Sequence, residues 1–364
     1  MKSGAGDTRP ESADLFDPHR HGDEDAAPGR CDFAVNVRPG PPAFLTAALS
    51  TRIDDLAAYP SNDDADAATR AAADLHGRRT DEVLLLGGAA EGFELLAKLG
   101  ATHVALIQPS FTEPERVLRA SGLRVSQVVL QAPWRLSEAQ IPEDADLVVV
   151  GNPTNPTSVL HARAEIDALR RPGRIVVIDE AFADVTMAAR DDDRPSYEPQ
   201  SMAGVAEKDL IVIRSVTKTF ALAGLRVGYL LASPEVIAQL QRGRRHWPLG
   251  TLALTALATC LGPQGQDYAR LQARQVATER DYLLARLAEI GVRPAVPPES
   301  SYVLVRMRDG LAVKSRLRER GIGIRSCANF VGLGPDHLRI AVRSPEQIDV
   351  LIEALGDVAT STAY

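Results

Sequence analysis

One lysine in this chain has surroundings that suit covalent chemistry. Lys218 lies between two short apolar segments, residues 210–213 and 227–232, and hydroxyl side chains precede it. The β-branched first segment and the apolar second segment predict buried strands. Partial desolvation between such strands, together with a nearby cation, favours the neutral amine, which is the form that condenses with an aldehyde. Lys218 is therefore a candidate Schiff-base residue.

A phosphate-binding group can be assembled beside this lysine. Ser215 and Thr217 supply hydroxyls, and Arg226 supplies a guanidinium that can bind phosphate through two hydrogen bonds. A Schiff-base lysine next to a phosphate cup is what pyridoxal phosphate requires. Taken alone, the short S-x-x-K spacing is explained better by a surface lysine in an ordinary ion pair, and serine β-lactamases contain the same letters. The rest of the chain decides between these interpretations.

A glycine-rich turn offers a second phosphate contact. Residues 86–92, Leu-Gly-Gly-Ala-Ala-Glu-Gly, join a predicted strand to a predicted helix. Free N–H groups in the first turn of a helix bind anions, which makes Gly88, Ala89 and Ala90 candidate contacts. The spacing lacks the G-x-G-x-x-G of dinucleotide folds. A tight turn without a ligand explains this segment equally well when it is taken alone.

Three further side chains follow predicted strands. Asp179 comes after the strand at 174–178, where a carboxylate is costly unless a cation such as a protonated pyridine nitrogen pairs with it. A helix cap is the structural alternative. Asn155 lies in a rigid Asn-Pro loop that can direct its amide at a ligand oxygen. Phe111 can stack on a planar ring, although most phenylalanines in such positions belong to a core.

Two arginines lie on predicted strands nearer the C-terminus. Arg325 and Arg339 are each flanked by apolar residues. A guanidinium in that setting favours an anion clamp over a free surface charge. We therefore expect both side chains to bind acidic groups.

Alternating strands and helices must position these residues. From residue 83 to residue 178 short apolar runs alternate with helical segments, which predicts a mostly parallel sheet covered on both faces. Ligands of such sheets bind beyond the carboxyl ends of the strands, where the candidate residues fall. A compact α+β unit begins after Gly291. The predicted division is a largely flexible N-terminal segment (1–30), an arm that packs with the small domain (31–50), a large cofactor-binding domain (51–262) and a small C-terminal domain (263–364).

Composition argues against several classes of function. The 364 residues are 45% hydrophobic and carry a formal net charge of −7 without a long basic block, which disfavours nucleic acid as a partner. The three cysteines are far apart and no metal-ligand spacing is present, so neither a disulfide framework nor a metal site is expected. No apolar stretch is long enough to span a bilayer, and no hydrophobic signal core begins the chain. We expect a cytoplasmic enzyme without a membrane partner.

In combination and in this order, the motifs resemble the fold-type I aminotransferases of class I/II, and most closely the histidinol-phosphate aminotransferase family. That family includes a cobalamin-pathway branch of threonine-phosphate decarboxylases. The resemblance extends from about residue 21 to about residue 357. It implies a PLP-dependent transferase fold of type I, with a mostly parallel sheet of the seven-stranded type in a large domain and a smaller α+β domain.

The resemblance also implies roles. Lys218 resembles the lysine that holds the cofactor and acts as general base, and Asp179 the residue that pairs with the pyridine nitrogen. Asn155 would donate to the ring oxygen, and Phe111 would stack on the ring. The implied cofactor contacts are completed by Gly88, Ala89, Ala90, Phe182, Ser215, Thr217 and Arg226.

Four residues correspond to substrate or subunit contacts of the family. Arg339 resembles the arginine that binds a substrate carboxylate, Arg325 the arginine that binds a substrate phosphate, and Asn36 an asparagine on the substrate side. Tyr59 resembles a tyrosine that reaches the cofactor phosphate of the neighbouring subunit. This last likeness implies a homodimer.

The chain departs from the family pattern at three positions. The usual D-E-A-Y ends here in Phe182, so a hydroxyl that often tunes the ring oxygen is absent. Ser158 replaces the glycine of the N-P-T-G run, and Arg38 replaces a more usual Asn or Glu after Asn36. Phe182 and the segment His21-Gly22 resemble the cobalamin branch more closely.

We therefore predict a pyridoxal 5'-phosphate-dependent aminotransferase that acts on a small phosphorylated amino compound, of which histidinol phosphate is the family's example, with a keto acid as a possible acceptor. The alternative is a threonine-phosphate decarboxylase of cobalamin biosynthesis. The two reactions differ in which bond to the α-carbon stands perpendicular to the cofactor ring, and the sequence leaves this open. A binding protein that keeps the fold without catalysis is an alternative of a different class, which the intact Lys218 disfavours.

Overall fold

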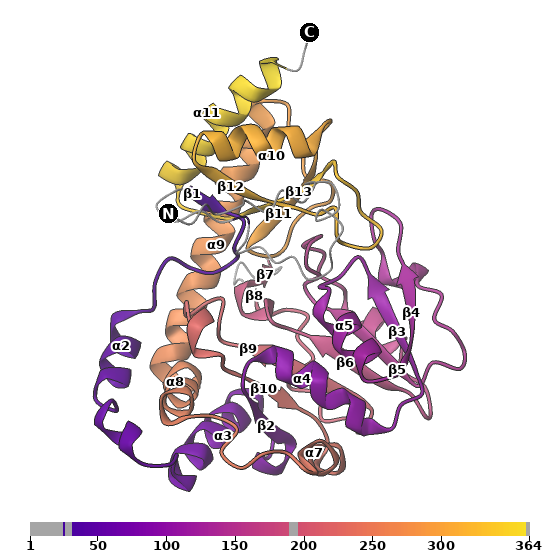
Figure 1. Cartoon of the computed structure of the whole chain (residues 1–364), viewed down its shortest axis with the longest axis vertical. Coiled ribbons are helices and arrows are strands. Elements are labelled where there is room, and N and C mark those ends of the chain that lie inside the picture. Colours follow the sequence, from indigo (N-terminus) through magenta and orange to yellow (C-terminus); the bar gives the residue numbers. More distant parts are fainter. Residues whose placement is uncertain (1–24, 26–30, 189–195, 362–364) are drawn as a thin grey trace, which may run out of the picture.

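The described residues form two large β-sheets, each with its own helices, and a separate two-stranded pair (Figure 1). The computed structural model describes residue 25 and residues 31–188 and 196–361. The larger sheet has seven strands, and β10 runs antiparallel to both its neighbours while the other pairs are parallel. This confirms the predicted mostly parallel sheet. In spatial order its strands are β2 (Val83–Leu86), β10 (Gly228–Leu231), β9 (Leu210–Ser215), β6 (Ile175–Asp179), β5 (Leu147–Gly151), β3 (His103–Gln108) and β4 (Arg124–Val129).

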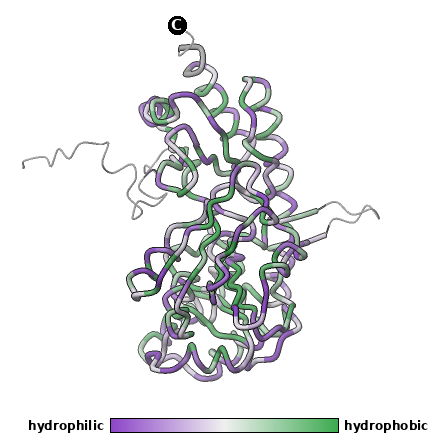
Figure 2. Tube along the Cα trace, turned by 90° about the vertical axis from the view of Figure 1, so that its right-hand side faces the viewer, coloured by the Kyte–Doolittle hydropathy of each residue, from purple (hydrophilic) through white to green (hydrophobic). Residues whose placement is uncertain are grey.

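Helices bury both faces of this sheet. Side chains alternate along a strand, and Val177 packs in one hydrophobic cluster while its neighbours Val176 and Ile178 pack in the other. One cluster is completed by α4 (Ala89–Leu95), α5 (Glu113–Ala120) and α7 (Pro234–Gln241). The other is completed by α2 (Ala43–Ser50), α3 (Asn62–His76), α6 (Arg163–Asp167) and α8 (Thr251–Leu261). Figure 2 shows hydrophobic segments running through the middle of the molecule, with hydrophilic segments around them.

A four-stranded sheet forms the centre of the smaller unit. Its order is β1-β12-β13-β11, so a strand from the start of the chain pairs with one near its end. The long helix α9 runs from the large sheet to this unit (Figure 1), since Ala269 packs in a core cluster of the first and Leu287 in that of the second. The elements are β1 (Cys31–Phe33), α9 (Pro263–Glu289), β11 (Tyr302–Arg306), α10 (Gly310–Glu319), β12 (Ile322–Ser326), β13 (His337–Ala341) and α11 (Pro345–Ser361), and a separate hairpin joins β7 (Met187–Ala188) to β8 (Ser196–Tyr197).

Some expected boundaries differ from the structure. The sequence of residues 234–246 predicts one helix, but the helix ends at Gln241, because the chain turns at Gly243, whose φ is 63°. The prediction that residues 1–30 are largely flexible falls outside the described residues except at Asp25, which is buried, and it stays a prediction. The four-part domain division stays a prediction. In the described part of the chain no helix is both long and apolar enough to cross a membrane.

Candidate active site

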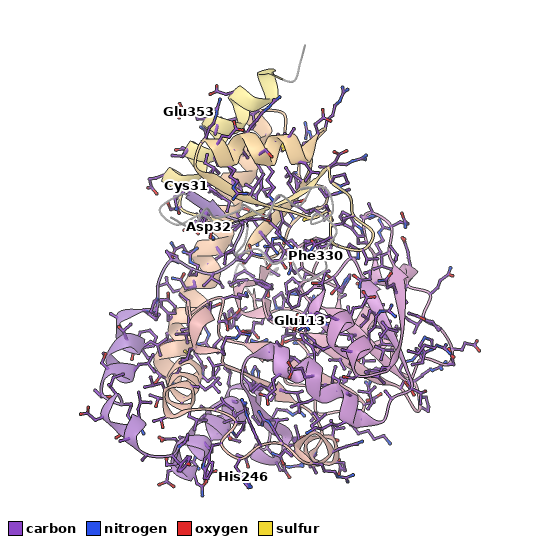
Figure 3. The ribbon with its side chains drawn as sticks, in the orientation of Figure 1. Cys31, Asp32, Glu113, His246, Phe330 and Glu353 are labelled. Atoms are coloured by element: carbon purple, nitrogen blue, oxygen red, sulfur yellow. The ribbon has the colours of Figure 1, made fainter. Side chains whose placement is uncertain are left out.

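A cavity of about 540 Å³ lies at the carboxyl ends of the parallel strands, between the two sheets. Figure 3 labels Glu113, which lines the cavity from the start of α5, and Phe330, which belongs to the smaller unit across from it. Residues from both sheets and from the N-terminal arm line the wall. The predicted residues among them are Asn36, Ala89, Ala90, Phe111, Asn155, Asp179, Phe182, Ser215, Thr217, Lys218, Arg226 and Arg339.

Lys218 reaches the cavity from the turn after β9. Burial lowers the pKa of its amine to about 8, and the positive charges of Arg339 and Arg226 contribute to this change. The amine nitrogen lies 5.6 Å from the centroid of the Phe182 ring. A large fraction of the amine is therefore neutral in mildly alkaline solution, as condensation with an aldehyde requires.

Asp179 and Glu180 point to opposite sides of β6. The cavity is lined by Asp179, whose Oδ1 accepts a hydrogen bond of 3.1 Å from the backbone N–H of Ala181. Removal from water raises its pKa to about 6. Glu180 is buried on the other side, where it accepts hydrogen bonds of 2.8 Å from Arg214 and 2.6 Å from the Met202 backbone. Glu180 thus has a cation of its own, and Asp179 is the carboxylate presented to a cationic ligand.

Unpartnered polar atoms face the cavity. In the described part of the chain, both amide atoms of Asn36 and the Nε of Arg339 are buried without a hydrogen-bond partner. The Nη1 of Arg339 donates to the Asn155 Oδ1 over 2.5 Å, and its Nη2 donates to the Ala34 carbonyl over 2.6 Å. Burial lowers the pKa of Arg339 to about 10. Buried polar groups without partners are rare in proteins, so these atoms indicate a ligand site.

Two glycines allow the phosphate-site residues to approach one another. Gly88 has a φ of 92°, and a Cβ there would come within 3.0 Å of an Arg226 guanidinium nitrogen. A Cβ on Gly228 would lie 2.6 Å from the Arg214 carbonyl oxygen and 3.2 Å from the backbone nitrogen of Ala89. Backbone contacts this close exclude a larger side chain. The first turn of α4 and the Arg226 guanidinium are therefore held at one end of the cavity.

Ser158 explains one departure from the family pattern. Its φ is 66°, in the left-handed region that favours glycine. The fully buried hydroxyl accepts hydrogen bonds from the backbone N–H groups of Glu299, at 3.1 Å, and Ser300, at 2.8 Å. The Ser158 carbonyl accepts a further hydrogen bond of 3.0 Å from the Glu299 backbone, so the serine hydroxyl strengthens a tie between the Asn155 loop and the segment before β11 that a glycine would make through its backbone alone.

Three of the predicted residues do not line the cavity, namely Gly88, which lies against Arg226, and Tyr59 and Arg325. Tyr59 is 75% exposed and stacks on Trp247, with ring centroids 4.2 Å apart. Arg325 is buried in β12, directly opposite Arg339 of β13. Its Nη1 donates to the Asp25 carboxylate over 3.2 Å and its Nη2 to the Asn329 side chain over 3.1 Å.

Sequence reasoning missed a buried ion pair that positions the N-terminal arm. Arg38 donates to the Glu279 carboxylate of α9 over 2.8 Å, and Gln275 donates to the same carboxylate over 2.8 Å. The backbone N–H of Arg38 also donates to the Lys218 carbonyl over 3.3 Å. Glu279 occupies a buried position of α9, and a charge on the buried stripe of a helix is a sequence signal for such a pair.

Replacing Arg38 by Ala is expected to destabilise the protein by about 3 kcal/mol, because it leaves the Glu279 carboxylate buried without its cation. The substrate KM should rise as well, since the arm that carries Asn36 loses its anchor. Thermal unfolding and steady-state kinetics measure the two effects. The double variant Arg38→Met/Glu279→Leu is the control and should recover most of the stability. A single variant as stable as the wild type would contradict the positioning role.

The residues that are present fit pyridoxal phosphate. A cationic ring nitrogen would compensate the buried Asp179 carboxylate, and the phosphate would meet Arg226 and the backbone of Ala89. The Lys218 amine shares the same cavity with both groups. Fold and site together define an enzyme of fold type I that uses this cofactor.

Comparison with known proteins identifies the family. The family model "Aminotransferase class I and II" matches residues 30–355, and the chain belongs to that family. It is an aminotransferase, and its cofactor is pyridoxal 5'-phosphate.

A histidinol-phosphate aminotransferase of Mycobacterium tuberculosis is 47% identical over 354 residues, covering 97% of this chain and 93% of that protein. The threonine-phosphate decarboxylase of Salmonella typhimurium is 29% identical over 350 residues, covering 91% of this chain and 92% of that protein. The crystal structure of the histidinol-phosphate aminotransferase from Clostridium acetobutylicum has a TM-score of 0.80 and 25% identity, and covers 91% of this chain and 99% of that one.

Proposed function

We propose that this aminotransferase takes the amino group from a small phosphorylated amino compound of the histidinol-phosphate type and passes it to a keto acid. The observation that carries the proposal is the pair of buried arginines, Arg325 and Arg339. They occupy directly opposite positions on β12 and β13, so their side chains emerge on the same face of the small sheet. Two guanidinium groups side by side suit a phosphate dianion. The 47% identity with the mycobacterial histidinol-phosphate aminotransferase supports the same substrate class.

The predicted residues in and beside the cavity wall have proposed tasks. Bound pyridoxal phosphate supplies an electron sink for the bond that breaks at the carbon bearing the amine. Lys218 would hold the cofactor through its Nζ, and the same atom, as a free amine, would carry a proton between two carbon atoms. Asp179 keeps the ring nitrogen protonated, and Asn155 donates to the ring oxygen. The proposed phosphate contacts are Gly88, Ala89, Ala90, Ser215, Thr217 and Arg226, while Phe111 and Phe182 contact the ring.

Decarboxylation of threonine phosphate is the second candidate, and Phe182 is the observation that favours it. Phe182 packs edge-to-face on Tyr302, with centroids 5.0 Å apart, and the Tyr302 hydroxyl donates to the Thr154 carbonyl over 3.0 Å. This tyrosine therefore does not replace the hydroxyl that position 182 lacks. The position of the substrate carboxylate relative to Arg339 decides between the two reactions.

One experiment separates the candidates. The enzyme loaded with pyridoxal phosphate is supplied with histidinol phosphate or threonine phosphate, each with 2-oxoglutarate. Glutamate formed from histidinol phosphate supports the transaminase, and unphosphorylated histidinol should react far less well. Carbon dioxide released from threonine phosphate without glutamate supports the decarboxylase. Neither product would overturn the proposed substrate class.

We infer that the active enzyme is a homodimer in the cytoplasm. Tyr59 and Trp247 form an exposed aromatic stack, and Ile53 and Leu56 nearby in the chain are each more than half exposed. A second copy that covers this surface would bury them and would bring Tyr59 to the cofactor phosphate of its partner. The cysteines of the described chain are free thiols, which agrees with a reducing compartment.

Subunit mixing tests the role of Tyr59. The Tyr59→Ala and Lys218→Ala variants should each have little activity when pure. When they are co-expressed, a hybrid dimer contains one site with its own Lys218 and an intact Tyr59 from the other subunit, so activity should return. The control is each variant expressed alone and purified in the same way, which forms dimers of one variant only. Hybrid dimers that stay inactive would contradict the shared site.

A further inference from the structure

A glutamate lies beside the proposed site for the cofactor phosphate. Glu91 is the third residue of α4, whose first turn supplies the proposed phosphate contacts Ala89 and Ala90. Its side chain folds back over the glycine-rich turn, where its Oε2 accepts a hydrogen bond of 2.5 Å from the backbone N–H of Gly87. A phosphate monoester carries about −1.5 to −2 charge at pH 7. An unpaired carboxylate in this turn would therefore repel the group that the turn is proposed to bind.

Arg244 neutralises this carboxylate. It lies in the segment after α7, just beyond the turn at Gly243. Its Nε donates to the Glu91 Oε1 over 2.9 Å and its Nη2 to the Glu91 Oε2 over 2.8 Å, the two-bond geometry that favours arginine as a partner for carboxylates. The Nη2 also donates to the Leu85 carbonyl of β2 over 2.7 Å. Only 10% of the Arg244 side chain and 16% of the Glu91 side chain are exposed, so solvent screens this pair weakly.

The pairing leaves the other arginine of this region for an anion. The Arg226 guanidinium packs on Gly88, and its Nη1 donates to the Ala223 carbonyl over 3.4 Å. Among the residues that the structure describes, Arg226 forms no ion pair. The carboxylate of this turn is thus bound by Arg244, and the charge of Arg226 stays available to the phosphate.

We propose that Arg244 is a positioning residue for the cofactor phosphate, because its ion pair holds the Glu91 carboxylate against the glycine-rich turn and neutralises the charge that would repel the phosphate. The proposal rests on the phosphate contacts proposed above. Neither residue is among the described residues that line the cavity, so the pair acts through charge and through the turn, without contact. The affinity for pyridoxal, which has the same ring without the phosphate, should therefore not depend on Arg244.

Titration of the cofactor-free protein with pyridoxal phosphate and with pyridoxal tests the proposal. Arg244→Gln leaves the Glu91 carboxylate without its cation, and it should raise the dissociation constant of pyridoxal phosphate by about ten-fold. The dissociation constant of pyridoxal should not change. The double variant Arg244→Gln/Glu91→Gln removes the repelling charge, while a glutamine at position 91 can still accept the hydrogen bond from Gly87. It should therefore recover most of the affinity for pyridoxal phosphate.

Arg119→Gln is the matched control. Arg119 makes the same kinds of contact on α5, where its Nε donates to Glu115 over 2.8 Å and its Nη2 to the Val125 carbonyl over 3.0 Å. Both dissociation constants should equal those of the wild type in this variant.

Two results would overturn the proposal by making the ion pair a purely structural brace. One is an equal loss of affinity for pyridoxal and pyridoxal phosphate in Arg244→Gln, and the other is a double variant that binds as weakly as the single one. Where Arg244→Gln does not fold, Glu91→Gln serves as the test. It leaves a cation beside the phosphate and should bind pyridoxal phosphate at least as tightly as the wild type, so weaker binding would also contradict the proposal.

Arg226→Gln separates this proposal from the proposed phosphate contacts. It removes a direct contact, and it should raise the dissociation constant of pyridoxal phosphate but not that of pyridoxal. If it does so while Arg244→Gln binds pyridoxal phosphate as the wild type does, the contacts stand and the role of Arg244 fails. If Arg226→Gln has no effect while Arg244→Gln has the expected one, the assignment of Arg226 fails and the role of Arg244 stands. No substrate enters these titrations, so they do not depend on which amine the enzyme uses.

Discussion

Replacing Lys218 by Ala is expected to lower turnover by about 10⁴-fold or more, because one side chain both holds the cofactor and moves the proton. The fold should survive, since the side chain makes no ion pair or hydrogen bond with the residues that the structure describes. The visible absorbance of the bound cofactor should change in the variant, and single-turnover measurements should show loss of the proton-transfer step. Lys218→Arg keeps a cation but no neutral amine, and it should be equally inactive.

A matched control and a pH profile sharpen this test. Lys208 is exposed in the loop before β9, so Lys208→Ala should behave as the wild type. Because burial holds the pKa of Lys218 near 8, the neutral amine increases as the pH rises to that value. Proton transfer should therefore accelerate from pH 6 to about pH 8 and then level off. Wild-type turnover in Lys218→Ala would contradict the catalytic role.

The sequence predicted the large sheet because its strands are buried on both faces. Such strands are continuous apolar runs, as at 147–150 and 210–213, and the intervening segments have helical periodicity. The candidate residues then follow from position, since Asp179 ends one strand of the sheet and Asn155 and Lys218 come just after two others. Parallel strands place their carboxyl ends at one edge, and the structure brings these three residues to one cavity there.

The residues that the sequence did not reveal are held by contacts between distant parts of the chain. Arg38 and Glu279 are 241 positions apart, and Asp25 and Arg325 are 300 positions apart. The buried position of Glu279 indicates that its carboxylate has a cationic partner, but no local pattern identifies the partner in either pair, because the two residues lie on distant segments. The end of α7 was missed for the opposite reason. The basic residues between 242 and 246 are typical of the last turn of a helix, while the positive φ of Gly243 ends it earlier.

Asp179→Asn is expected to lower turnover by about 10²–10³-fold, because the amide cannot hold the ring nitrogen in its protonated form. The substitution keeps the size of the side chain and its hydrogen bond from the Ala181 backbone, so the cavity should keep its shape. Cofactor affinity should fall as well, since the charge that the carboxylate contributes to the site is gone. Turnover and the dissociation constant of pyridoxal phosphate measure the two effects.

In the same variant the free energy of unfolding should depend on pH in a way that a change of packing would not produce. In the cofactor-free protein, burial raises the pKa of Asp179 from 3.8 to about 6, so the folded state binds a proton that the unfolded state has lost between those values. The contribution of Asp179 to the free energy of unfolding is therefore complete below about pH 4. It falls by at most about 3 kcal/mol as the pH rises to about 6. Asp179→Asn should remove this fall in the free energy of unfolding between about pH 4 and pH 6. Asp184 and Glu180, whose pKa values burial also raises, titrate in both proteins, so the difference between the two unfolding curves isolates Asp179.

Bound pyridoxal phosphate should abolish the difference in slope, because a protonated ring nitrogen compensates the Asp179 carboxylate and removes the reason for its raised pKa. Urea unfolding at a series of pH values from 4 to 7, with and without the cofactor, makes the comparison. Parallel stability curves for wild type and Asp179→Asn without cofactor would show that Asp179 is not desolvated. A slope that persists with the cofactor bound would show instead that Asp179 does not face the ring nitrogen, and its proposed role would then be wrong.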